Sequence, residues 1–161
     1  GFNASQIRDI HRSLSTSQSG KRFFTNEWEV LRDREYLWIQ KKDSIQLIPE
    51  LIIEEIERTP SFVIPRDKHI ACLDADKLNH PLTIRKWEKG DKFIPLGMNG
   101  KKKVSDYLTD KKFSLFQKEN QYVVCSGEEI VWLVNERSDH RYRITDSTQR
   151  ILLIKIKKDG Q

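Results

Sequence analysis

A helical period opens the chain. Apolar side chains recur at steps of three and four residues between Ile7 and Leu14, which predicts an amphipathic helix over residues 5–14. Asn3 lies just before this segment and Gln6 follows it three residues later. This spacing is that of a capping box, in which each side chain accepts a hydrogen bond from a free backbone N–H group of the first turn. We therefore expect Asn3 to cap the start of the helix.

Most of the remaining pattern is typical of short antiparallel strands, because apolar and polar positions alternate between turn residues. We predict a three-stranded meander over 22–25, 28–31 and 36–39, and further strands over 51–56, 62–64, 69–73, 82–87, 122–125, 130–134, 142–145 and 151–156. Turns are expected at 41–44 and 90–91, and a loop at 95–100. A helix is expected from Val104, interrupted near Asp110 and resuming toward Phe116. The sum predicts an α+β protein rich in antiparallel strand.

Charge is distributed unevenly along the chain, whose net charge is +5 over 161 residues. Residues 1–80 hold 12 Lys and Arg against 13 Asp and Glu, whereas residues 81–161 hold 17 against 11. Such asymmetry predicts two units with different surfaces. We divide the chain into residues 1–68 and residues 69–161. A basic unit attracts polyanions, because binding to phosphates releases their counterions.

The cysteines and the apolar runs indicate a cytoplasmic protein. Cys72 and Cys125 lie in separate apolar runs and form no CxxC pair, so we expect two buried thiols in a reducing compartment rather than a disulfide. No apolar run is long enough to span a membrane. Residues 1–6 are polar and do not resemble a secretory signal. Because the chain does not begin with Met, we expect it to be a fragment of a longer protein.

The sequence lacks the common patterns of catalysis. Gly20-Lys21 has neither the upstream Gly nor the following Ser or Thr that a P-loop needs. Asp74 and Asp76 flank an expected turn, and nothing in the pattern places them in a pocket. No metal-ligand spacing relates the four histidines, His11, His69, His80 and His140. We therefore predict no catalytic residue, no metal and no cofactor in this chain.

The densest chemical signal lies between residues 85 and 112, where nine basic residues stand against four acidic ones. Lys101, Lys102 and Lys103 precede the start of a predicted helix, where free backbone N–H groups add to the positive potential. A loop of this kind suits a phosphate group. A solvated, functionless loop is the alternative that the residues alone leave open.

The same region resembles the C-terminal region of bacterial tRNA(Ile)-lysidine synthetases. Five pieces carry the resemblance in order: Arg85-x-Trp87, Gly90-Asp91-Lys92-Phe93, Pro95-x-Gly97-Met98, residues 102–108 (KKVSDYL) and Ile130-Val131-Trp132. Arg137, Asp139, Arg141-Tyr142 and Thr145 fit the closing pattern of the family, and the first forty residues resemble the segment that follows its catalytic domain. Asn135 departs from the pattern, since the family commonly has Gly there, but Asn tolerates a left-handed backbone.

The resemblance implies a fold and a function. The family joins lysine to the wobble cytidine of an isoleucine tRNA, with ATP activating the base. The pyrophosphatase loop of the family is absent from this sequence, so ATP and lysine would bind a separate N-terminal catalytic domain. Residues 1–68 would form a substrate-binding linker unit with a helix and a meander, and residues 69–161 an α+β domain built around a β-sandwich. The implied partners are isoleucine tRNA and the catalytic domain, whereas a homodimer belongs to the alternative function of a dimerisation scaffold.

Under this resemblance the chain would position tRNA without itself being catalytic. The side chains expected to contact RNA are basic: Arg85, Lys86, Lys89, Lys101, Lys102, Lys103, Lys111, Lys112, Arg137, Arg141 and Arg143. Four aromatic residues, Trp87, Phe93, Tyr107 and Trp132, could stack on bases, but core packing suits their strand and helix positions better. The alternative function is a structural or dimerisation scaffold that packs on the catalytic domain without touching RNA.

Overall fold

The computed structural model describes residues 1–16, 18–42 and 48–158, and divides them into two compact units. The first unit holds residues 1–47 and 112–119, and the second holds 48–111 and 120–161. Contacts therefore join residues 48–68 to the second unit, whereas the sequence pattern placed the division after residue 68. Within the described ranges, no helix is long and apolar enough to cross a membrane.

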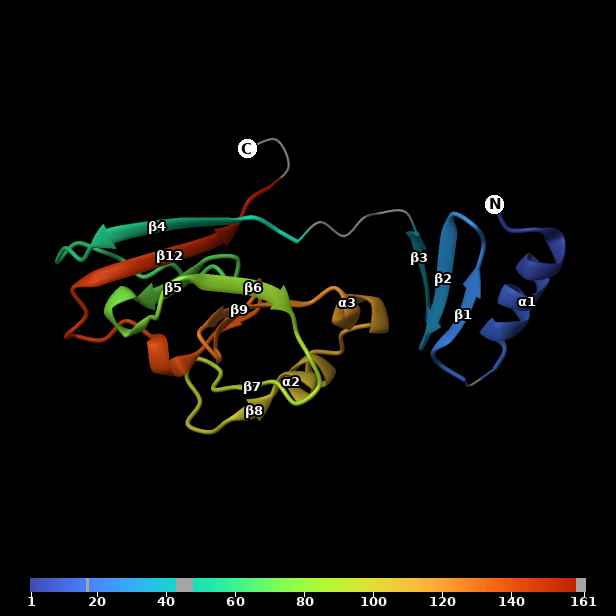
Figure 1. Cartoon of the computed structure of the whole chain (residues 1–161). Helices are drawn as coiled ribbons and strands as arrows, with labels where there is room; N and C mark the ends of the chain where they lie inside the picture. Colours follow the sequence, from blue (N-terminus) through green and yellow to red (C-terminus); the bar gives the residue numbers. More distant parts are fainter. Residues whose placement is uncertain (17, 43–47, 159–161) are drawn as a thin grey trace. The chain divides into compact units, whose positions relative to one another are not determined.

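The first unit combines a helix with a small antiparallel sheet (Figure 1). Its elements are α1 (Ala4–Leu14), β1 (Lys21–Phe24), β2 (Trp28–Asp33), β3 (Tyr36–Lys41) and α3 (Leu115–Glu119), and the sheet order is β1-β2-β3. The predicted capping box is present, because Asn3 Oδ1 accepts from the Gln6 N–H at 2.9 Å and Gln6 Oε1 accepts from the Asn3 N–H at 3.0 Å. The predicted helix and meander are confirmed. The turn expected at 41–44 lies partly outside the described residues.

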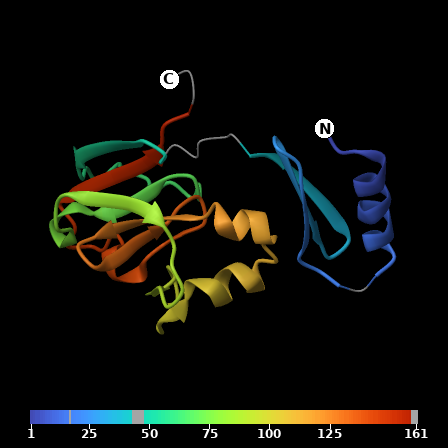
Figure 2. The same cartoon turned by 45° about the vertical axis from the view of Figure 1, so that its right-hand side comes forward.

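The second unit is a sandwich of two antiparallel sheets with a hairpin and a helix attached (Figures 1 and 2). One sheet has the order β4-β12-β5 and the other β11-β10-β9-β6, while β7 and β8 pair separately. The elements are β4 (Leu51–Glu57), β5 (Ala71–Asp74), η1 (Ala75–Lys77), β6 (Leu82–Lys86), β7 (Lys92–Phe93), β8 (Lys102–Lys103), α2 (Val104–Asp110), β9 (Tyr122–Ser126), β10 (Glu129–Leu133), β11 (Arg137–Ser138), η2 (His140–Tyr142) and β12 (Arg150–Ile156). The predicted α+β class is confirmed.

The core of the second unit lies between its two larger sheets. Leu152 and Ile154 of β12 pack in one buried cluster with Leu73 of β5, Val124 of β9 and Trp132 of β10. Strand β12 is central to its sheet and pairs along its whole length with β4. The end of the chain therefore holds residues 51–57 and 71–74 together.

Two expected strands are absent from the described structure, and both predictions were wrong for a local reason. Residues 62–64 lie between Pro60 and Pro65, whose backbone nitrogens carry no N–H to donate to a sheet ladder. Tyr142 ends the η2 turn and residues 143–145 follow it. Asp139 caps the start of this turn by accepting from the Arg141 N–H at 2.9 Å. Side-chain hydrogen bonds of this kind compete with strand pairing.

The two cysteines are free thiols, as expected, but their burial differs. Cys125 is buried, and burial raises the pKa of its thiol. Cys72 is only half-buried, which corrects the expectation of a fully buried side chain, and burial still raises its pKa to about 11. Asn135 has φ 60°, the left-handed conformation that Asn was expected to tolerate at this position.

Candidate nucleic-acid interface

The centre of the candidate interface is the β7–β8 hairpin, residues 92–103. In its ladder Lys92 lies opposite Lys103, and Phe93 lies opposite Lys102. Phe93 is fully buried and packs edge-on against Tyr107 with ring centroids 5.5 Å apart, so it fixes the hairpin to α2. Directly opposed side chains of an antiparallel pair lie about 5 Å apart at Cβ, and like charges there repel. The hairpin therefore places two exposed lysines directly opposite each other.

Lys92 was not among the residues predicted to bind RNA. The sequence shows it only as one polar position beside a buried Phe, and nothing local indicates that Lys103 is its cross-strand partner. The pairing depends on a loop that brings residues 93 and 102 together. Lys103, which was predicted, gains from this neighbour a local potential that suits a phosphate oxygen.

Exposed cations without an ion pair in the described part of the chain are spread over the second unit and include Arg66, Lys111, Lys155 and Lys158. Five more lie on the β7–β8 hairpin or in segments next to it: Lys89, Lys92, Lys101, Lys103 and Arg137. Four of them were predicted from the sequence. A cation without a carboxylate partner can neutralise a phosphate without first breaking an internal bond. These five are the side chains best placed to bind a polyanion.

Two of the predicted lysines, Lys102 and Lys111, already interact with the Tyr107 ring within the unit, so they are less free to bind a phosphate. Lys102 Nζ lies 2.5 Å from Asp110 Oδ2 and 5.9 Å from the Tyr107 ring centroid. Lys111 Nζ lies 5.7 Å from the same centroid. Each ammonium group is attracted to the negative face of the ring. Burial raises the pKa of the Tyr107 hydroxyl, so the ring stays neutral at physiological pH.

Lys86 and Lys112 are exposed but belong to different surroundings. Lys86 ends β6 in the second unit. Lys112 groups with the first unit, where its carbonyl oxygen accepts a hydrogen bond from Arg34 Nη1 at 3.3 Å. Lys112 also has φ 59°, a left-handed conformation that ends α2 near the position where the sequence predicted an interruption.

Arg85 has a structural partner. Its Nη1 and Nη2 donate to Asp91 Oδ2 and Oδ1 at 2.8 and 3.0 Å, the bidentate geometry of a strong arginine–carboxylate pair. Asp91 Oδ2 also accepts from the Glu88 N–H at 2.8 Å, which closes the turn through Gly90. Burial opposes ionisation of Asp91, but the Arg85 hydrogen bonds outweigh it and lower the pKa of that carboxyl. Arg85 therefore shapes the entry to β7.

Arg141 is likewise bound within the unit. Its Nε and Nη2 donate to the carboxylate of Asp139 at 3.0 and 2.9 Å, and its Nη1 lies 2.8 Å from Glu129 Oε2. Asp139 is fully buried and also accepts from the Ile94 N–H at 2.8 Å. The hydrogen bonds to Asp139 hold the pKa of the Arg141 guanidinium above its usual range. This arginine anchors the segment that supports the hairpin loop.

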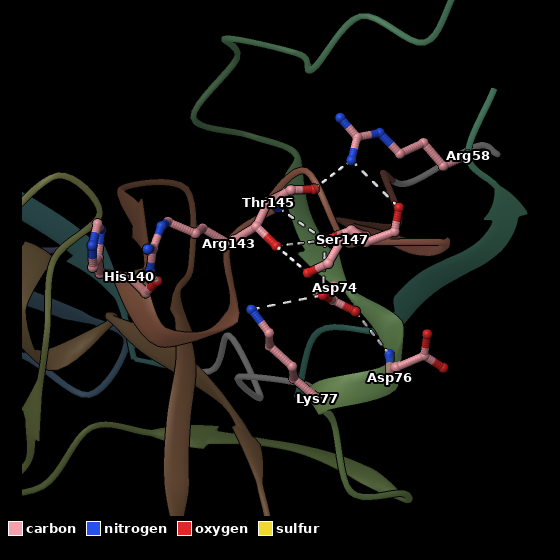
Figure 3. Close-up of polar contacts among 9 residues, drawn as sticks. Arg58, Asp74, Asp76, Lys77, His140, Arg143, Thr145 and Ser147 are labelled. Carbon is pink, nitrogen blue, oxygen red and sulfur yellow. Dashed lines mark hydrogen bonds and ion pairs between the residues drawn. The ribbon is translucent and has the colours of Figure 1, made fainter. Parts of the chain in front are cut away.

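Arg143 is half-buried and bonds to the backbone, since its Nη1 donates to the His140 carbonyl at 2.8 Å (Figure 3). The structure thus divides the predicted arginines. Arg137 is exposed and has no ion pair in the described ranges, whereas the other three hold local structure.

The two carboxylates considered in the sequence also belong to a structural network (Figure 3). Buried Asp74 accepts from the Thr148 hydroxyl at 2.8 Å, and Lys77 Nζ lies 3.7 Å away. Asp76 Oδ1 accepts from Arg150 Nε at 2.9 Å. These contacts join β5 to the start of β12. Nothing in the described ranges gathers three metal-ligating side chains.

Three of the four aromatic side chains pack in the core, as their strand and helix positions predicted. Phe93, Tyr107 and Trp132 expose 0, 6 and 1% of their surface. Such rings cannot stack on a base without unfolding the unit. Trp87 is half-exposed on the segment after β6.

Comparisons with known proteins match both parts of the chain. The family described as TilS substrate binding domain matches residues 1–42, and the family described as TilS substrate C-terminal domain matches residues 82–154. The tRNA(Ile)-lysidine synthase of Bacteroides thetaiotaomicron is 54% identical over 159 residues, which are 97% of this chain and 37% of that protein. That of Parabacteroides distasonis is 44% identical over 168 residues, with 96% and 38% covered.

A solved structure shares the fold. The crystal structure of a TILS C-terminal domain superposes with a TM-score of 0.58 at 18% identity, and the match covers 69% of this chain and 85% of that one. The chain spans less than two fifths of the length of the two curated relatives.

Proposed function

We propose that this chain, which belongs to the C-terminal domains of the tRNA(Ile)-lysidine synthase family, holds the isoleucine tRNA on which such a synthase acts. The ligation of lysine to the wobble cytidine, with the ATP it consumes, takes place on a separate N-terminal catalytic domain of the synthase. The chain itself contributes binding and no catalytic residue.

One observation carries the proposal: three exposed lysines without ion pairs in the described ranges, Lys92, Lys101 and Lys103, lie on one hairpin of the second unit. A base-paired RNA stem is gripped mainly through its phosphates and 2′-hydroxyls, by shape. Lys92, Lys101 and Lys103 supply the positive groups such a stem needs. Arg85 and Arg141 act indirectly, because they fix the turns on either side of that hairpin.

Salt-dependent binding of tRNA tests the proposal. The paired variants are Lys101→Glu/Lys103→Glu on the hairpin and Lys155→Glu/Lys158→Glu, which make the same change in charge at the exposed end of β12. Affinity for an isoleucine tRNA transcript is measured at about 50 and 200 mM salt. We expect the hairpin variant to bind at least about tenfold more weakly. The slope of log affinity against log salt concentration should also fall by the amount that about two lost phosphate contacts give. The control variant should keep most of its affinity and most of its salt dependence.

Equal loss in the two variants would mean that only net charge matters, and it would contradict a site on the hairpin. Circular dichroism shows whether each variant is folded. Incubation of the chain with ATP, lysine and tRNA should give no lysidine, and any turnover would contradict the assignment of chemistry to another domain.

A scaffold role is the second candidate, and the first unit favours it. Ile7, Ile10, Leu37 and Ile39 line an apolar groove of about 500 Å³. Apolar surface of this kind marks contacts with other proteins. If the chain is only a scaffold or a dimerisation module, the Lys101→Glu/Lys103→Glu variant will bind tRNA as the unaltered chain does, and sedimentation without RNA will show a dimer.

A further inference from the structure

The loop of the β7–β8 hairpin contains a tightly held turn, Pro95–Met98. The Met98 N–H donates to the Pro95 carbonyl at 2.9 Å, and Gly97 has φ 88°, which is the third position of a type II turn. A side chain at Gly97 would be strained by this backbone conformation. The turn is therefore specified by its sequence.

Hydrogen bonds to residues 138–140 fix this turn in place. The Leu96 N–H donates to the Ser138 carbonyl at 2.9 Å, and the Gly97 N–H donates to His140 Nδ1 at 3.1 Å. Buried Asp139 fixes Ile94, the residue before the turn, because its carboxylate accepts a hydrogen bond from the Ile94 N–H. A loop bonded in this way loses little conformational entropy when it binds a ligand.

The rigid turn displays apolar side chains. Leu96 is 40% exposed and Met98 is 44% exposed, and they lie between the lysines at the two ends of the same hairpin. Leu96 also borders a groove of about 150 Å³ that Ile64 and Arg137 line. Two apolar side chains at the tip of a cationic hairpin are not explained by phosphate binding.

The chemistry of RNA limits what this tip can contact. Along an A-form stem the accessible groups are phosphates, 2′-hydroxyls and base edges, which offer little to an apolar side chain. The face of a base becomes available where stacking ends, at a terminal pair or an unpaired nucleotide. Leu and Met are among the apolar side chains that DNA-binding proteins insert between base steps, where they contact the faces of bases.

We propose that the Pro95–Met98 turn is an apolar wedge, in which Leu96 and Met98 cover the open face of a base at the end of a stem while Lys92, Lys101 and Lys103 bind the adjoining phosphates. This inference rests on the proposed function, because it assumes that the hairpin binds RNA. It adds a preference for the end of a helix over its interior.

The experiment uses RNA duplexes of one sequence with 2-aminopurine either in the terminal pair or in the middle, because this base changes its fluorescence when its stacking changes. The variant is Leu96→Ser/Met98→Ser, which keeps every backbone hydrogen bond of the turn. The control is Val63→Ser, since Val63 is 82% exposed in the same unit. A third duplex closed at both ends by tetraloops removes the open base face.

We expect the unaltered chain to change the fluorescence of the terminal probe and not of the central one. The wedge variant should lose this response and about five- to tenfold in affinity for the open duplex, the gain from burying two half-exposed apolar side chains. Its affinity for the closed duplex and its salt dependence should stay as in the Val63→Ser control.

Each other outcome contradicts the wedge in a distinct way. If the charge variants lose affinity but the wedge variant does not, the proposed function stands and the wedge fails. If no duplex and no tRNA binds, both fail. If the wedge variant instead abolishes self-association seen in sedimentation, the turn contacts protein and not RNA.

Discussion

The two units of the chain bury their apolar side chains to different degrees. In the second unit Leu73, Phe93 and Trp132 expose 1% of their surface or less. In the first unit Ile39 is 64% exposed and Ile7 is 56% exposed. The second unit closes a core between two sheets, whereas α1 covers only part of one three-stranded sheet.

This difference separates two tasks. A unit with a closed core can present charged side chains on rigid turns, because its fold does not depend on them. A unit with an apolar groove retains surface that another protein surface can bury. This difference supports our proposal that the second unit recognises RNA, and it suits the first unit to packing contacts.

The largest effect should come from the core of the second unit. Trp132→Ala removes a ring that is 1% exposed, and we expect it to lower the free energy of unfolding by about 3–5 kcal/mol. Trp28→Ala in the first unit is the matched control, because Trp28 is 36% exposed, and it should cost at most about 1 kcal/mol. Urea unfolding followed by circular dichroism measures both. Similar losses would contradict the comparison.

An intermediate effect should come from the Arg85–Asp91 pair. Because the pKa of Asp91 is lowered in the folded state, its stabilisation is present above the pKa of the unfolded chain and is lost as pH falls through the folded pKa. We expect Asp91→Asn to cost about 1–2 kcal/mol at neutral pH. The variant and the unaltered chain should converge in acid.

Thermal unfolding from about pH 7 down to about pH 3 measures this convergence. Glu128→Gln is the control, since Glu128 is an exposed carboxylate of the same unit without an ion pair in the described ranges. A gap between the Asp91→Asn variant and the unaltered chain that stays constant with pH would show that the charge of Asp91 is not what stabilises the turn.

The smallest effect on folding should come from the exposed face of the first unit. Ile39→Ser changes a side chain that is 64% exposed, so we expect a change of at most about 0.5 kcal/mol in the free energy of unfolding. The same substitution should weaken any self-association, measured by sedimentation. A loss above about 1 kcal/mol would mean that Ile39 supports the unit internally.

The elements that the sequence predicted well are those fixed by neighbouring residues. The capping box over Asn3 and Gln6 is local, so spacing alone identified it. Alternation also located most strands. It failed at 142–145, where the buried Asp139 carboxylate and the η2 turn determine the backbone. Such a carboxylate looks like any polar residue in the sequence.

The candidate site was predictable as a region and not as a set of contacts. Basic residues between 85 and 112 indicated a region of net positive charge that includes the hairpin, and its role as a site stays a prediction. The sequence could not separate Arg85, which is paired with Asp91, from Lys101, which forms no ion pair in the described ranges. Nor could it show that Lys92 faces Lys103, because register depends on the fold of the loop between them.

The opposition of Lys92 and Lys103 gives dissolved ions two contrary effects on the same hairpin. In the free protein, added salt screens the repulsion between the two ammonium groups and so stabilises the pairing of β7 with β8. In a complex with RNA, the cations of the salt compete with the lysines for the phosphates. Moderate salt should thus stabilise the unbound hairpin and weaken its binding to RNA. A bound polyanion and a dissolved electrolyte both reduce the repulsion between the two lysines, the first by binding and the second by screening.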